Sequence, residues 1–212
     1  MTYGRKVLVS ALALGLCALM PDGAGAFAYP LSEEAVRDAY FLGQDVQKAA
    51  PFLRQYVRRF PAPKKGPYVY EIDLRTPYAE VVRRALEHSL DYSAQRAQKD
   101  YGAQPARVIV TVQIFLTRTY GYITPPTDSK GQAVKRSEEF WREFPVRVTQ
   151  EHSIEANKVT SRLLHGRYGK LSGAEVLLEF APEQFASRVT QVTVNTPDGQ
   201  TLEANFDLDA LR

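Results

Sequence analysis

The sequence predicts an α+β protein in which helices pack on a twisted antiparallel sheet of about five to six strands. Before residue 100, apolar residues recur mainly at three- and four-residue spacing, whereas after residue 107 they recur at every second position. A turn of Pro197, Asp198 and Gly199 between two alternating segments indicates an antiparallel hairpin. The alternative is a β-sandwich with helical additions, because several short strands separated by turns also fit that class.

Residues 1–26 have the organisation of a secretory signal peptide. A basic pair, Arg5 and Lys6, precedes an apolar run over residues 7–20, and a series of small residues ends at Ala26. The run is shorter than the roughly 20 residues needed to cross a bilayer. We therefore expect cleavage after Ala26 and an exported protein, either periplasmic or extracellular.

Composition limits the chemistry of the exported chain. The one cysteine, Cys17, lies in the leader, so residues 27–212 offer no disulfide, thiolate metal ligand or cysteine nucleophile. With 44% hydrophobic and 24% charged residues, the chain resembles an ordinary folded protein, and residues 27–212 suffice for a single α+β domain. The net charge of +3 is too small to indicate nucleic-acid binding.

Residues 27–60 are expected to form two helices. Ser32 is a suitable N-cap for the first helix, and Gly43 is expected to end it. The second helical pattern follows from Asp45, but its true start is expected near Pro51, which suits a first-turn position.

A basic linker over residues 61–67 leads to a predicted strand over residues 68–74. One long helix is then expected over residues 76–99, because Thr76 and Pro77 form a typical helix start. Further strands are expected over residues 107–120, 144–148, 174–180, 189–194 and 202–208. Residues 155–172 are ambiguous, and residues 124–135 are expected to form an exposed loop.

The sequence contains no recognisable catalytic, metal-binding or cofactor-binding motif. The three histidines are too far apart in sequence for a close-spaced zinc motif. His152 is expected to be a buried core histidine sharing a face with Phe144 and Val148, with a catalytic base as the alternative. His165 is expected to cap a helix, and His88 to be solvated. The nucleophile elbow and the phosphate-binding glycine loop are both absent, so we expect no cofactor.

Two stretches contain several cations and no acidic residue, and they supply the candidate anion- or partner-binding residues. These are Arg54, Arg58, Arg59, Lys64 and Lys65 in the first stretch, and Arg162, Arg167 and Lys170 in the second. Brought together, they would form a basic face for an anionic surface, lipid head group or polymer. The alternative is two separate solvated faces.

Four aromatic residues near the expected loop are candidates for contact with a sugar or a partner protein: Tyr120, Tyr122, Phe140 and Trp141. The alternative is that these rings pack in the core, where such side chains usually lie.

The segment PLSEEAVRDAYFLG, residues 30–43, resembles the opening of certain exported bacterial proteins of unknown function. A looser likeness covers Phe206, Asp207 and Leu208 in the closing hairpin. This resemblance implies a bacterial, envelope-associated protein and carries no activity or site.

Together these observations predict an exported, non-catalytic protein that binds a partner protein or an anionic envelope component. No nucleic-acid partner and no transmembrane span after cleavage are expected. One alternative is a secreted hydrolase with a site built from His152 and carboxylates that the fold brings together. Another is a structural subunit of an envelope assembly, for which an exposed apolar patch or a vacant sheet edge would be the sign.

Overall fold

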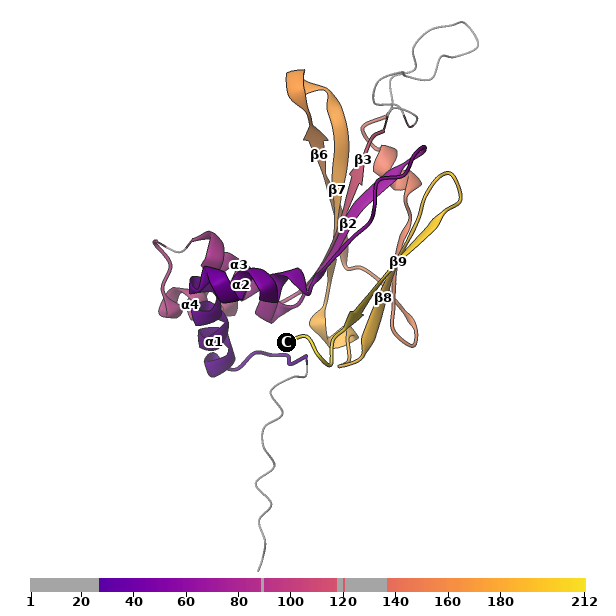
Figure 1. Cartoon of the computed structure of the whole chain (residues 1–212). Helices are drawn as coiled ribbons and strands as arrows, with labels where there is room; N and C mark the ends of the chain where they lie inside the picture. Colours follow the sequence, from indigo (N-terminus) through magenta and orange to yellow (C-terminus); the bar gives the residue numbers. More distant parts are fainter. Residues whose placement is uncertain (1–26, 89, 118–119, 121–136) are drawn as a thin grey trace, which may run out of the picture.

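A helical layer lies beside two antiparallel sheets (Figure 1). The structure, a computed structural model, describes residues 27–88, 90–117, 120 and 137–212. The expected signal peptide, the whole of the expected loop over residues 124–135, and Tyr122 therefore lie outside the described residues.

The helical layer consists of α1 (Glu33–Gln44), α2 (Val46–Arg54), α3 (Pro77–Glu87) and α4 (Ala94–Ala103). Each helix begins after a residue whose side-chain oxygen accepts a hydrogen bond from a first-turn N–H, which satisfies a donor that the helix itself cannot. These residues are Ser32, Asp45, Thr76 and Ser93. Helix α1 packs against the other three helices around a small apolar cluster that includes Val36, Tyr78 and Val82.

The expected long helix is two helices. Helix α3 ends at its C-cap, His88, and Ser93 starts α4 by capping it. The same apolar spacing runs through both segments because both helices contact α1, so periodicity alone did not reveal the break.

Three further expectations in the first helical region are wrong. Gly43 lies within α1 and does not end it, and Pro51 lies inside α2 because Asp45 has already started that helix. The third is that helices fill residues 27–60: α2 ends at Arg54, and the chain then becomes the short strand β1 (Val57–Arg59).

The larger sheet has five strands in the order β1-β2-β3-β7-β6, and all pairs are antiparallel. Its other members are β2 (Tyr68–Arg75), β3 (Val108–Phe115), β6 (Lys158–His165) and β7 (Leu171–Phe180). The ambiguous residues 155–172 thus contain an edge strand and the turn that joins it to β7. The expected strand over residues 107–120 ends at Phe115.

The smaller sheet has four antiparallel strands in the order β5-β4-β8-β9. They are β4 (Val146–Thr149), β5 (Ser153–Ile154), β8 (Val189–Asn195) and β9 (Thr201–Asp207). The predicted hairpin is confirmed: Gly199 takes φ +84° in the turn between β8 and β9, a conformation that suits glycine.

Side chains from both sheets form one hydrophobic core, which includes Ile72, Val112 and Val176 from one sheet and Val192 and Phe206 from the other. The α+β class is therefore confirmed, but the expectation of a single sheet is wrong. Alternation along a strand shows which side chains face a core, but it does not show which sheet the strand joins. The alternative, a β-sandwich with helical additions, has the observed number of sheets.

Among the described residues, none of the helices combines the length and the apolar character needed to cross a bilayer.

Candidate functional site

The two predicted basic stretches lie on opposite edges of the five-stranded sheet. Arg59 on β1 and Arg162 on β6 are the ends of one row of side chains that crosses the sheet through Glu71, Gln113 and Glu175. Each arginine is paired with its neighbouring carboxylate at 2.7 Å. These two arginines are therefore already engaged in cross-strand contacts.

Arg58 is also held by internal contacts. Its guanidinium donates hydrogen bonds to the carbonyls of Gln55 and Val57 and lies 4.9 Å from the centroid of the Phe206 ring. It therefore covers the side of the sandwich where β1 approaches β9. Arg54 is exposed at the end of α2.

The remaining four candidates, Lys64, Lys65, Arg167 and Lys170, lie at one end of the five-stranded sheet, and we call them the cationic end. The strand register explains this placement. Both the β1–β2 connection and the β6–β7 turn adjoin the row in which Phe115 pairs with Tyr68 and Gly173.

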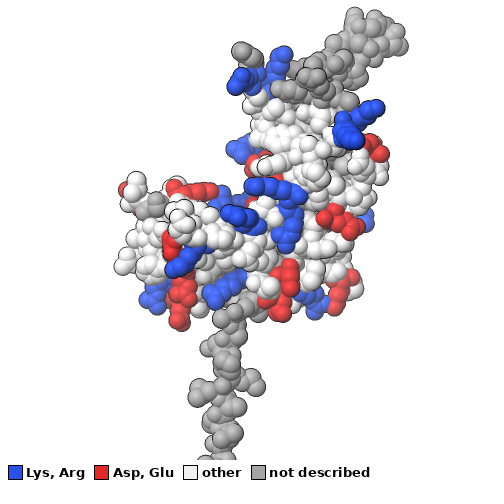
Figure 2. Space-filling view, viewed as in Figure 1, with Lys and Arg blue, Asp and Glu red and all other residues white. Residues whose placement is uncertain are grey.

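Figure 2 shows Lys and Arg side chains on both sides of this upper end of the sheets. All four residues of the cationic end are exposed, and none has an acidic partner within 4.0 Å among the described residues. Asp198, in the turn between β8 and β9, lies beside Gly66 of the β1–β2 connection and accepts hydrogen bonds from Thr196 and Gln200.

An aromatic cluster that sequence reasoning missed lies beside the cationic end, on the outer face of the five-stranded sheet. Tyr68, Tyr70 and Phe115 are half-buried, with ring centroids 5.5 to 6.2 Å apart. The sequence signal that could have revealed this cluster is that the three aromatic residues lie at the ends of two strands and alternate with the core residues Val69 and Ile114. The Tyr68 hydroxyl donates to the carbonyl of Phe60. Half-buried tyrosines, with an apolar ring and a polar hydroxyl, suit the boundary between water and an apolar phase.

The predicted aromatic contacts are corrected for two residues. Phe140 is 1% exposed and packs against Phe144, and Tyr120 is buried with its hydroxyl bonded to Glu143. Their rings belong to the core and cannot stack on an external ligand. Trp141 is half-buried, with Arg142 over its ring.

The histidines are also placed differently from the prediction. His152 is exposed in the turn between β4 and β5, because the strand ends at Thr149 before the alternation reaches it. It lines an open hollow with Glu151 and Ser153, and no hydrogen bond joins these side chains within the described part of the chain. His165 ends β6 instead of capping a helix, while His88 is exposed as expected.

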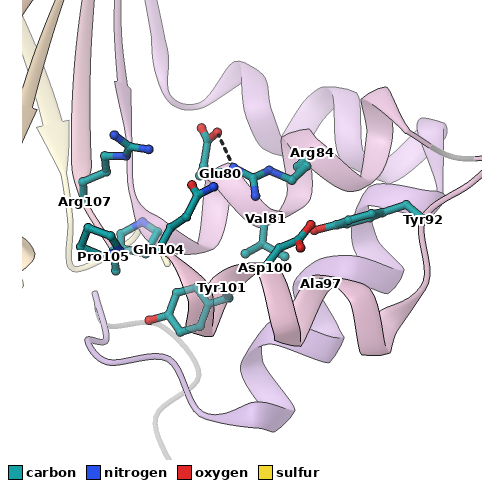
Figure 3. Close-up of a pocket in the computed structure, with 12 residues that line it drawn as sticks. Glu80, Val81, Arg84, Tyr92, Ala97, Asp100, Tyr101, Gln104, Pro105 and Arg107 are labelled. Carbon is teal, nitrogen blue, oxygen red and sulfur yellow. Dashed lines mark ion pairs between the residues drawn. The ribbon is translucent and has the colours of Figure 1, made fainter.

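A second hollow lies between α3, α4 and the segment before β3, and Figure 3 shows its lining side chains. It encloses about 470 Å³, including the solvent at its open mouth. Glu80 lies 4.0 Å from Arg84, and Arg107 is held at 2.6 Å by Glu179 outside the hollow. Burial, with a contribution from nearby Asp100, raises the pKa of Tyr92.

The chemistry available in this hollow is limited. Its described lining contains no serine, cysteine or histidine, so it lacks the usual nucleophile and base of covalent hydrolysis. Among the described residues, no group of three or more His, Cys, Asp or Glu side chains could hold a metal ion.

A buried ionic cluster beside the hollow joins the helices to the sheet. Arg75 on β2 contacts Asp73 and Glu80, with Nε 2.9 Å from Asp73 Oδ2, and its terminal nitrogen donates to Thr111 Oγ1 at 2.7 Å. The Nε contact lacks hydrogen-bond geometry, and Asp73 Oδ1 has no hydrogen-bond partner in the described structure.

Burial raises the pKa of Asp73 to about 6 against the opposing attraction of Arg75. Such a shift marks either a functional group or an internal ion-pair network. Here the contacts come from β2, α3 and β3, so the cluster fastens α3 to the sheet.

No model of a protein family matches this chain, and no curated protein matches it in sequence.

Proposed function

We propose that this is an exported, non-catalytic protein that binds an anionic lipid surface of the cell envelope through its cationic end. The observation that carries the proposal is the placement of Lys64, Lys65, Arg167 and Lys170 at one end of a single sheet. Residues separated by about a hundred positions in sequence lie at that end on two turns, exposed and without acidic partners among the described residues.

The electrostatics favour a surface of many charges over a single small anion. The cations stand on two separate turns, and they do not converge on an enclosed pocket. A lysine or arginine near an anionic membrane gains attraction from the surface potential, which falls off within a Debye length. Several exposed cations on one end therefore act together on a surface that they all approach at once.

The aromatic cluster of Tyr68, Tyr70 and Phe115 supports a lipid surface in particular. It lies immediately beside the β1–β2 connection that carries the two lysines. Tyrosine is favoured at membrane interfaces because its ring is apolar and its hydroxyl is polar. A purely ionic polymer would make no use of such rings.

The proposal is tested by co-sedimentation of the purified protein with vesicles of phosphatidylglycerol and phosphatidylcholine. The wild-type protein should bind these vesicles and should not bind vesicles of phosphatidylcholine alone. The double variants K64E/K65E and R167E/K170E should each lose about tenfold or more in affinity, because each removes two attractive charges and adds two repulsive ones.

The matched control is R37E/K99E, which changes the net charge equally at exposed positions on α1 and α4. This variant should bind like the wild type. Equal losses in all three variants would show that net charge alone drives binding, and wild-type binding by both cationic-end variants would rule the proposal out.

A further inference from the structure

Two vacant sheet edges lie on opposite sides of the sandwich. Strand β6 ends the five-stranded sheet and β9 ends the four-stranded sheet, and in the described structure neither has a strand on its outer side. An unpaired strand edge offers backbone donors and acceptors to another strand. The two edges are similar in length, at eight and seven residues.

The two edges carry opposite charges at the same spacing. On β6, Lys158 and Arg162 lie four residues apart on the outer face, with side chains 61% and 72% exposed. On β9, Glu203 and Asp207 also lie four residues apart, are exposed, and have no cation within 4.0 Å among the described residues.

The cross-strand rows of the larger sheet end in these cations. In one row Glu179 is followed by Lys158, and in the row four residues further along β6 Glu175 is followed by Arg162. Opposite charges on adjacent strands stabilise pairing, whereas like charges oppose it. A further strand beyond β6 would therefore fit best with acidic residues beside Lys158 and Arg162.

Strand β9 of a second copy meets this requirement in antiparallel pairing. When Arg162 lies opposite Glu203 of the second copy, the same register sets Lys158 opposite Asp207. The apolar faces then coincide, because directly opposite residues point to the same side of a sheet. The matching pairs on that side are Val159 with Phe206, Ser161 with Ala204, and Leu163 with Leu202.

The strands that lie across the sandwich from β6 and β9 are compatible with this pairing. Strand β5 lies on the β6 side, where a hollow of about 560 Å³ is lined by Val146, Ile154 and Val159. Strand β1 lies on the β9 side, where Arg58 covers Phe206. Joining β6 of one copy to β9 of a second copy would thus place β5 of the first copy next to β1 of the second. This contact would cover the hollow.

We propose that the protein self-associates head to tail by pairing β6 of one copy with β9 of the next. The contact joins two different surfaces, so each copy keeps one free edge, and the assembly continues as a filament or closes as a ring. This association uses different residues from the cationic end and is independent of lipid binding.

The test is sedimentation velocity over a wide range of protein concentration. The wild-type protein should form species larger than a monomer, and these should dissociate as salt is raised. K158E/R162E makes both edges acidic, and E203K/D207K makes both edges basic, so each variant alone should be monomeric.

Mixing the two variants should restore association. Each acidic edge then meets a basic edge on the other variant, and the copies alternate. Circular dichroism of each variant checks that it is folded, and K64E/K65E should associate like the wild type. A monomeric wild type at every concentration, or folded variants that remain monomeric after mixing, would overturn the proposal.

Discussion

At the scale of single residues, Asp73 shows how burial changes a side chain's effect on stability. Its side chain is 20% exposed, and the cost of desolvating the carboxylate exceeds the attraction of Arg75, so its pKa rises from 3.8 to about 6. Between these two values the folded chain holds a proton that the unfolded chain has released. Stability from this group therefore falls as pH rises from about 4 to about 6, and stays lower above that range.

Replacing Asp73 with Asn should remove this loss. The free energy of unfolding at pH 7 should rise by about 1 to 3 kcal/mol, since each unit of pKa shift corresponds to about 1.4 kcal/mol. The stability of Asp73→Asn should also depend less on pH between 4 and 6. Urea unfolding across this range measures both effects.

Asp38→Asn, at an exposed position on α1, is the control and should leave both quantities unchanged. Lower stability of Asp73→Asn at pH 7 would mean that the contact with Arg75 outweighs the desolvation of Asp73.

The residue scale is also where sequence reasoning was least complete. Extending the alternation of β4 beyond Thr149 predicts a buried His152, but the strand ends at Thr149. Phe140 and Tyr120 flank a predicted loop and are therefore candidates for external contact, but the alternative, packing in the core, is what the structure shows. Sequence neighbourhood did not show which side chains the tertiary fold would cover.

At the scale of elements, the close contact between α1 and α3 depends on a glycine. A Cβ atom on Gly43 would lie 2.6 Å from the Cβ of Ala85, and it would also collide with the backbone of Val82. Gly43 was expected to stop α1, but its role is to let the two helix backbones approach each other.

Gly43→Ala should lower the free energy of unfolding by about 1 to 3 kcal/mol, because overpacking forces helices apart. Gly102→Ala, in α4, is the matched control: an added Cβ there meets nothing within 4 Å. This control should raise stability by about 0.5 to 1 kcal/mol, because alanine restricts the unfolded chain and favours the helix. Equal effects of the two changes on thermal unfolding would contradict the close-packing account.

Several elements could be predicted because their signals are local. Ser32 and Thr76 cap α1 and α3 as expected, and the alternation in β2, β3 and β7 correctly identified strands. The break between α3 and α4 and the assignment of strands to two sheets depend on contacts far apart in sequence. Helix and strand patterns carry little information about such contacts.

At the scale of the whole molecule, the candidate site depends on strand order. The sequence identified eight cations but could not show that Arg59 and Arg162 occupy opposite edges and pair with Glu71 and Glu175. Nor could it show that the four residues of the cationic end, which come from two different turns, reach the same end of the sheet. Only the antiparallel order β1-β2-β3-β7-β6 separates the paired cations from the cationic end.

The most direct test of the lipid-binding account asks which end of the molecule meets the membrane. The sequence has one cysteine, Cys17, so in a Cys17→Ser background a single engineered cysteine can carry an environment-sensitive fluorophore. Ala62→Cys places the probe in the exposed β1–β2 connection, and Ala103→Cys places it at the exposed end of α4.

Upon addition of phosphatidylglycerol vesicles, the probe at position 62 should shift to shorter wavelength, whereas the probe at position 103 should not change. High salt should reverse the shift, because the attraction between exposed charges is screened. A shift at position 103 without one at position 62, or no shift at either position, would contradict the account.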